Sequence, residues 1–298
     1  MALISILAVL MASQFPGHAT GQAQTLQDPP MPPALQPEIL GEGVVSRADR
    51  HEFCQTLSRD RRTLTIGIEH GTWQLIEEYR WDGARWVGPK PVIGKPEYNA
   101  HDPYLSADEQ RLYFITRAQG SSDLTYLTRG EDGAWGNPVQ LGAPINSPGD
   151  DYYTSITRDG RVYFSSNRGG KGFDLYTANL ADPQSAKAVR LSDRINTSAY
   201  EGDPYIAPDG RYLIFASDRR GGRGRGDLYL SVADGKGGWS DPIAFDDRVN
   251  TKGHELCPMV SLDGSAFMFT SNQDIRWISN AVIEEMIAGH KANSQINP

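Results

Sequence analysis

The chain has 298 residues, which suits one large domain or two ordinary ones, so its length leaves the number of domains open. It contains 29 Lys and Arg residues against 37 Asp and Glu residues, giving a formal net charge of -8. This acidic balance excludes a nucleic acid held through its phosphates, because such partners are bound by a basic stripe.

The chain begins with an apolar run from Ala2 to Ala12, followed by Pro16, Gly17 and small residues up to Ala23. The run is too short to span a bilayer and favours a signal peptide over residues 1–23. The alternative is a buried or disordered apolar start, since no Lys or Arg precedes the run. The sequence thus predicts export to the periplasm or the medium, with no transmembrane anchor in the mature chain.

A proline-rich stretch comes next, over residues 24–37. Proline lacks the backbone donor that helices and inner strands need, so this stretch is expected to be an extended spacer.

Five similar segments follow, and each consists of two apolar runs on either side of an acidic turn. The segments are Phe53 to Ile68, Asp102 to Arg117, Tyr153 to Asn167, Asp203 to Asp218 and Cys257 to Asn272. Their turn carboxylates are Asp60, Asp108, Asp159, Asp209 and Asp263, at intervals of 48 to 54 residues. Three of the turns are Asp-Gly, a pair that suits tight hairpins, so each segment predicts a β-hairpin.

Two further strands are expected in each repeat. Third strands are predicted at Leu124 to Leu127, Asp174 to Thr177, Asp227 to Leu230 and Ile275 to Ile278. A short fourth strand follows a turn that ends in Trp86, Trp135 or Trp239, with a Pro shortly after it, as suits an edge strand.

The second strands are almost continuously apolar, which predicts sheets that are covered on both faces. One four-stranded unit of about 50 residues could not bury enough surface alone, whereas five units stacked in a ring can. We therefore predict one five-bladed all-β propeller of four-stranded antiparallel blades over residues 38–280. The last copy lacks a fourth strand, and Glu38 to Ser46 matches the fourth-strand passages, so this segment is expected to pair with Ile275 to Ile278.

A short C-terminal helix with a tail is expected over residues 281–298. Val282, Ile283, Met286 and Ile287 recur at helical spacing, with Asn280 as the expected start and Gly289 as the expected end.

The repeat resembles the PD40, or WD40-like, repeat of TolB-type propellers. The resemblance rests on TRDGRVYFSSNRGGKGFDLY from Thr157 to Tyr176 and on APDGRYLIFASDRRGGRGRGDLY from Ala207 to Tyr229. It covers roughly residues 38–280, although Arg61 replaces the turn Gly in the first copy. The resemblance implies a propeller that is often periplasmic or secreted and acts as an interaction module, or less often carries a sugar-active site. A shared fold is poor support for a function.

Acidic residues recur at the start of the first strand of each repeat, which lines the channel of a propeller. Four copies have a carboxylate eight residues before the turn, and two copies have one six residues before it, with histidines beside several of these positions. The candidate ligand- or cation-binding residues are Glu52, Asp102, Asp151, Glu201, Asp203, Glu255, His51, His101 and His254.

These acids allow three interpretations. They could accept backbone N–H groups and hold neighbouring blades together. They could bind a cation such as Ca²⁺, or the hydroxyls or positive charge of a ligand. Two of them could be the acid and base of a glycoside hydrolase. No zinc-protease motif, nucleophile elbow or phosphate-binding loop occurs, and the basic stretch from Arg219 to Gly226 suits a flexible turn better than an anion site.

The two cysteines lie at equivalent positions, six residues before the turn of the first and last copies. Ring closure makes these copies neighbours, so Cys54 and Cys257 are candidates for a disulfide across the seam. Two buried free thiols are the alternative, because a bridge needs Cα atoms within about 7 Å.

From the sequence we expect a binding or assembly module that uses the channel mouth and its loops for a protein or carbohydrate ligand. Tyr152, Tyr153, Tyr200 and the loop tryptophans would offer a stacking surface. No cofactor is expected, apart from Ca²⁺ as the cation that a ring of acids could hold. The alternative is a carbohydrate-active enzyme, glycoside hydrolase-like, that uses the channel acids.

Overall fold

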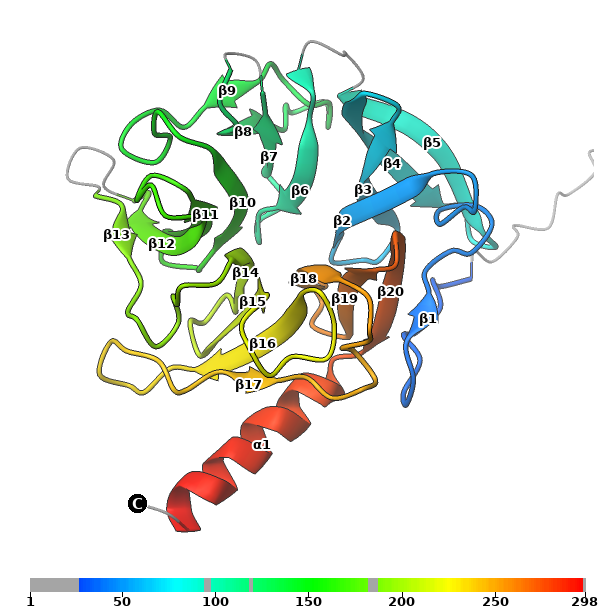
Figure 1. The fold of residues 1–298 in the computed structure, drawn as a ribbon. Helices are drawn as coiled ribbons and strands as arrows, with labels where there is room; N and C mark the ends of the chain where they lie inside the picture. Colours follow the sequence, from blue (N-terminus) through cyan, green and yellow to red (C-terminus); the bar gives the residue numbers. More distant parts are fainter. Residues whose placement is uncertain (1–26, 94–97, 118–119, 182–186, 297–298) are drawn as a thin grey trace, which may run out of the picture.

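The computed structural model describes residues 27–93, 98–117, 120–181 and 187–296. They form a five-bladed β-propeller in which every blade is a four-stranded antiparallel sheet, as the sequence predicts. Figure 1 shows the blades around a central axis in chain order, with a helix at the rim. The expected signal peptide lies outside the described residues. No helix in the described part of the chain is long and apolar enough to cross a membrane.

Each blade runs outward from an inner strand at the axis. The inner strands are β2 (His51–Leu57), β6 (His101–Leu105), β10 (Asp151–Ile156), β14 (Glu201–Ile206) and β18 (Glu255–Val260). The second strands are β3 (Thr63–His70), β7 (Arg111–Thr116), β11 (Arg161–Ser166), β15 (Tyr212–Ser217) and β19 (Ala266–Ser271). The third strands are β4 (Trp73–Trp81), β8 (Asp123–Thr128), β12 (Asp174–Asn179), β16 (Asp227–Val232) and β20 (Asp274–Ser279).

The outermost strands are β5 (Trp86–Ile93), β9 (Val139–Gln140), β13 (Val189–Arg190), β17 (Ile243–Ala244) and β1 (Glu38–Ile39). Four of them have only two residues. The passages that were expected to form complete fourth strands therefore pair only at their start. The remainder of each passage turns inward and connects to the next inner strand.

The turn carboxylates fix the hairpins through local hydrogen bonds. The carboxylate of Asp263, for example, accepts the Ser261 hydroxyl at 2.5 Å and the Ser265 N–H at 3.1 Å. Asp60 and Asp108 accept the corresponding hydroxyls of Ser58 and Ser106. Each carboxylate thus takes the donors that a tight turn leaves without partners, which explains why it recurs in all five copies.

The core lies between the blades. One apolar cluster joins blade 1 to blade 2, another joins blade 2 to blade 3, and a third joins blade 3 to blade 4. The largest cluster runs through blades 4, 5 and 1. Side chains such as Phe114, Phe164 and Phe215 are 0% exposed, because each second strand is covered by the neighbouring sheets on both faces.

The two ends of the chain meet in the fifth blade. Glu38 and Ile39 pair with Trp277 and Arg276 of β20, and the Leu40 N–H donates to the Ile275 carbonyl at 2.8 Å. The predicted closure is therefore present, with a strand shorter than the expected segment from Glu38 to Ser46. The rest of that segment is a turn that buries Leu40 and Val45.

Helix α1 (Ala281–Ile296) packs on the outside of blades 4 and 5 through Val282, Ile283 and Ile287. It does not end at Gly289, as expected, but continues to Ile296. Asn280 does not cap it either, because its side-chain oxygen is buried without a partner among the described residues. The first N–H, that of Ala281, donates to the Ser279 hydroxyl at 3.3 Å.

Removing the chain up to Ser46 should destabilise the whole propeller. A chain that starts at Arg47 loses β1 and the burial of Leu40 and Val45, which are 1% and 0% exposed. Each side chain contributes about 1.5–3 kcal/mol, so the melting temperature should fall by roughly 10 °C or more. A chain that starts at Gln27 is the control, and equal thermal unfolding of the two would contradict closure by β1.

Candidate functional site

Every inner strand carries a bulge at the same position. The strand register shifts there in all five blades, and the residue has a left-handed backbone. These residues are Cys54, Asp102, Tyr153, Asp203 and Cys257, with φ angles of 45°, 54°, 46°, 51° and 53°. Non-glycine residues rarely adopt this conformation, and bulges that turn a side chain toward a site are common near functional centres. We call these five residues the axial ring.

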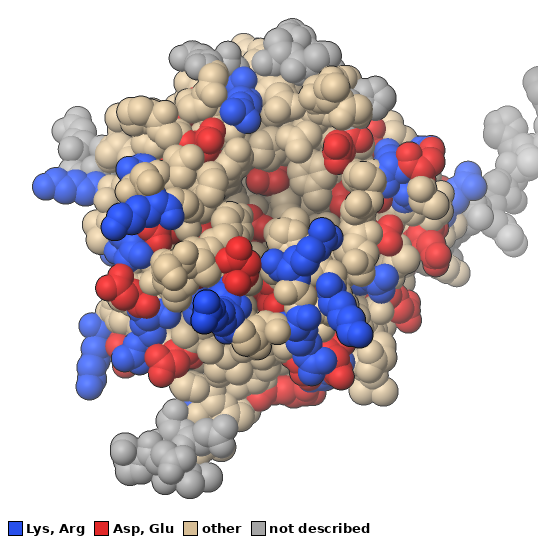
Figure 2. Space-filling view, viewed as in Figure 1, with Lys and Arg blue, Asp and Glu red and all other residues tan. Residues whose placement is uncertain are grey.

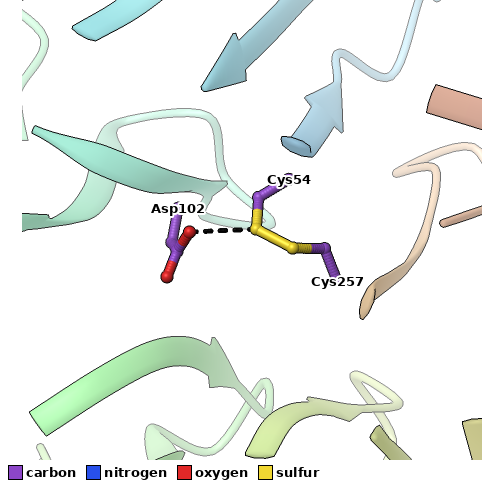
Figure 3. A group of neighbouring side chains, drawn as sticks. All are labelled: Cys54, Asp102 and Cys257. Atoms are coloured by element: carbon purple, nitrogen blue, oxygen red, sulfur yellow. Dashed lines mark hydrogen bonds between the residues drawn. A yellow bond between two sulfur atoms is a disulfide. The ribbon is translucent and has the colours of Figure 1, made fainter. Parts of the chain in front are cut away.

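The side chains of the axial ring are buried and contact one another across blades. Cys54 and Cys257 form a disulfide between β2 and β18, with Cα atoms 4.9 Å apart (Figure 3). Asp102 Oδ1 lies 2.9 Å from Cys54 Sγ. Asp203 Oδ2 accepts the Cys257 N–H at 3.1 Å, and the Tyr153 hydroxyl donates to the Pro258 carbonyl at 2.9 Å. The ring therefore fastens the inner strands to each other at the axis.

A cavity of about 950 Å³ opens above the axial ring. Its wall includes Cys54, Asp102, Asp203 and Cys257 from the ring, and the three histidines His51, His101 and His254. Aromatic side chains from three blades, Trp73, Tyr152 and Tyr200, line it as well. In the view of Figure 2, acidic side chains are visible close to the axis, among Lys and Arg side chains that lie further out.

Glu52 and two carboxylates of the axial ring are almost fully buried in the cavity wall. Asp102 is 9% exposed and lies 3.1 Å from Nδ1 of His101, while Asp203 is 7% exposed. Burial, together with the negative charge of Asp102, raises the pKa of Asp203 to about 7, although the Cys257 N–H and His101 oppose the rise. Asp203 therefore gains or loses its proton near neutral pH.

The histidines have different surroundings. His51 is half exposed and lies 3.0 Å from the Glu69 carboxylate at the rim. Burial and the nearby Arg225 lower the pKa of His254. His101 is buried between Asp102 and the rings of Phe53 and Tyr152. The sequence thus predicted all three histidines at one mouth, and the structure brings them to one cavity.

The carboxylates eight residues before the turns do not form an acidic ring at the mouth. Only Glu52 lines the cavity, whereas Asp151, Glu201 and Glu255 are absent from its wall and are 0% exposed. Glu201 accepts the Thr197 N–H at 2.8 Å, the Thr197 hydroxyl at 2.7 Å and the Ser217 hydroxyl at 3.0 Å. Ser147 and Thr251 bind Asp151 and Glu255 in the same way. These acids fasten the connections between blades, which is the structural interpretation weighed above.

Arginines of the repeat motif complete this network. Arg219 donates to the Ile195 carbonyl at 2.6 Å and lies 3.2 Å from Glu201, with its guanidinium over the ring of Phe215. Arg168 contacts Asp151 and Phe164 in the third blade in the same way. The Ser-Asn-Arg and Ser-Asp-Arg sequences are therefore structural. In the stretch from Arg219 to Gly226, only Arg225 lines the cavity.

The aromatic residues were placed only partly correctly. Tyr152 and Tyr200 line the cavity, but Tyr153 belongs to the axial ring and is 2% exposed. Trp86, Trp135 and Trp239 pack in the apolar clusters of the outer strands and offer no surface at the mouth. The tryptophan at the mouth is Trp73, at the start of β4, and no repeat pattern in the sequence had pointed to it.

Comparisons with known proteins support the fold. No family model and no curated protein matches the chain. A TolB-type protein of Agrobacterium tumefaciens matches at 20% identity and a TM-score of 0.50, over 74% of this chain and 70% of its own. TolB from Acinetobacter baumannii matches at 13% identity and a TM-score of 0.51, over 77% of this chain and 54% of its own. An endo-arabinase of Bacteroides thetaiotaomicron matches at 15% identity and a TM-score of 0.57, over 79% and 96%. The chain is thus a TolB-like propeller in fold.

Mutation of two acids in the fourth blade should change the stability of the protein in different ways: Glu201→Ala should lower it, and Asp203→Asn should change how it depends on pH. Glu201→Ala leaves Arg219 and the Thr197 donors without their buried partner and should lower the free energy of unfolding by about 3–5 kcal/mol.

The pKa of Asp203 is raised from 3.8 to about 7, so the folded state holds more protons than the unfolded state between these values. Unfolding free energy should therefore fall as the pH rises toward 7, and Asp203→Asn should remove that part of the fall.

Urea denaturation from pH 4 to 8 measures both effects, with the exposed Glu42→Ala as a neutral control. The groups that face Asp203 are Asp102, His101, Tyr153 and Tyr200. An unchanged stability of Glu201→Ala would contradict the structural assignment, and an unchanged pH profile of Asp203→Asn would contradict the raised pKa.

Alkylation of thiols tests the disulfide between Cys54 and Cys257 in solution. Protein that is purified without reductant and then denatured should show no alkylated thiol, and two after reduction. The bridge spans 203 residues between blades 1 and 5, so Cys257→Ser should lower the unfolding free energy by about 2–4 kcal/mol. Two thiols alkylated before reduction would show that the cysteines are free.

Proposed function

We propose that this protein is an exported binding module of the PD40-repeat type, which captures its ligand in the cavity at one mouth of the propeller channel. The observation that carries the proposal is the composition of the cavity wall. Buried carboxylates, three histidines and four aromatic residues line one volume of about 950 Å³, which suits a small ligand or the end of a larger one. The repeat motifs and the likeness in fold to TolB proteins support the assignment to this type.

The chemistry of the wall favours a ligand with hydroxyl or cationic groups and a face that can stack. Asp102 and Asp203 offer carboxyl groups in a sheltered site, where a hydrogen bond to an ionised carboxylate is worth about 1.5–3 kcal/mol. Trp73, Tyr152 and Tyr200 offer ring faces nearby. A carbohydrate or a segment of a protein partner has both properties.

The arginines at the rim extend this surface. Arg117 and Arg225 line the cavity, and both are exposed. They provide positive charge at the entrance, whereas the floor is acidic. A ligand that enters the channel would therefore place a cationic or hydroxyl group at the floor and an anionic or carbonyl group at the rim.

A second candidate function is glycoside hydrolysis, and the raised pKa of Asp203 favours it. A protonated Asp203 could donate its proton to a leaving oxygen, and Asp102 could be the second carboxyl group. The fold of the Bacteroides endo-arabinase is compatible with this chemistry. We rank it second because Asp203 already accepts the Cys257 N–H and Asp102 contacts His101 and Cys54.

Screening glycan and peptide arrays with the wild-type protein should yield ligands whose affinity drops about tenfold or more in Asp102→Asn and in Asp203→Asn. Asp193→Asn is the matched control, because Asp193 is 92% exposed and outside the cavity wall. Ligands that bind all variants equally would contradict the cavity as the site. If a glycan is cleaved and Asp203→Asn abolishes turnover while the melting temperature stays unchanged, the hydrolase replaces the binding module.

A further inference from the structure

Three potential metal ligands of the axial ring lie together. Sγ of Cys54, Sγ of Cys257 and a carboxylate oxygen of Asp102 are all within 4.8 Å of one another, and all three residues are buried. They come from β2, β18 and β6, on three different blades, and the left-handed bulge at each position directs them to the axis (Figure 3). The cluster is also part of the cavity wall, which gives a path of entry from solvent.

The position of Asp102 fits the reduced state of the cysteines. Its Oδ1 lies 2.9 Å from Cys54 Sγ. A disulfide sulfur has no hydrogen to donate, so in the oxidised state this carboxylate gains no hydrogen bond from the contact. A thiol would donate to it, and a cation shared by the thiolates and the carboxylate would be bound by both.

The charge around the cluster also favours a cation. Asp102 and Asp203 are both buried in the cavity wall, and His101 is the basic residue that the structure brings against Asp102. A divalent cation at the axis would compensate the charge of Asp102. Apolar and aromatic side chains, Phe53, Tyr152 and Leu256, surround the sulfurs and would shield such an ion from water.

We propose that the reduced protein binds one thiophilic divalent cation, such as Zn²⁺, through the two thiolates and Asp102. Two sulfurs and one oxygen suit a tetrahedral ion that keeps its fourth position for water or for Asp203. His101, which lies 3.1 Å from the other oxygen of Asp102, would orient that carboxylate. The Thr270 hydroxyl accepts the Cys54 N–H, and Asp203 accepts the Cys257 N–H, so the backbone of both ligands is fixed.

The metal and the disulfide exclude each other, because both use the sulfur atoms of Cys54 and Cys257. A dithiol reductant supplies two electrons and two protons, the S–S bond breaks and two thiols form, while the reductant becomes a disulfide. The cation then displaces both thiol protons and forms two metal–sulfur bonds and one metal–oxygen bond. The same two cysteines would thus close the seam in an oxidising compartment and hold a metal in a reducing one.

Titration of the full-length, fully reduced protein with Cd²⁺ tests the proposal. The thiolate-to-cadmium charge-transfer band should rise to one equivalent, two protons should be released per ion, and a large excess of Zn²⁺ should compete with Cd²⁺ for the site. Asp102→Asn should weaken binding about tenfold or more, and Cys54→Ser should abolish the band. Asp193→Asn should bind as the wild type does, and the oxidised protein should show no band.

Three results would overturn the proposal. The first is a reduced protein that keeps its thermal transition and shows no charge-transfer band. The second is an unchanged affinity in Asp102→Asn, which keeps the test valid even if Cys54→Ser does not fold. The third is Ca²⁺ binding to oxidised and reduced protein alike, which would place the cation on the carboxylates alone.

Discussion

Closure of the ring is the constraint on which the rest of the structure depends. A blade of this propeller is apolar on both faces, and only its two neighbours can cover it, so an open stack would leave one face of the first and last blades in water. Blade 5 has only three strands from the C-terminal side, and β1 supplies the fourth. Cys54 and Cys257 lie across the same junction between blades 1 and 5, nearer the axis. The seam is therefore fastened at its outer and at its inner edge.

Closure also explains where the charged residues of the repeat go. The chain must cross from the rim of one blade to the axis of the next, and this crossing buries backbone groups that no strand can satisfy. The side-chain amide of Asn196 accepts the Leu175 N–H and donates to the Leu175 carbonyl. The Thr197 hydroxyl donates to Glu201, and Arg219 donates to the Ile195 carbonyl. The polar residues that recur most regularly in the sequence thus bind the buried backbone groups of the turns and of the connections between blades. They recur because every blade has these groups.

The sequence predicted the fold well because this need repeats. Five turn carboxylates at steady spacing, apolar second strands and a missing last strand sufficed for the blade count and for closure at Glu38. It predicted less about details that tertiary packing decides. Helix α1 is held to the propeller by Glu284 and Glu285, which pair with Arg211 and Arg248, and by three buried apolar side chains, and these contacts join segments that are distant in the sequence.

The candidate site was found in part, and the reason lies in how a repeat can mislead. Carboxylates recur eight residues before the turn, and their recurrence drew attention to Asp151, Glu201 and Glu255, which are structural. Asp102 and Asp203 were found because both lie six residues before their turns, and the histidines were found because they lie beside the acidic positions. Trp73 was missed because it lies at the start of a third strand, where no other copy has a comparable residue to align with it.

The axial ring shows which signal separates the two kinds of position. The residue six places before the turn has the same left-handed backbone in all five blades, yet its side chain is Cys, Asp, Tyr, Asp and Cys in turn. Where both the backbone conformation and the side chain are the same in every blade, the residue has a structural role that each blade needs. Where the backbone is strained in the same way in every blade but the side chain differs, the side chain is expected to have a function specific to this protein. By that criterion the axis is where the function of this propeller should be sought, since four of the five residues of the axial ring line one cavity there.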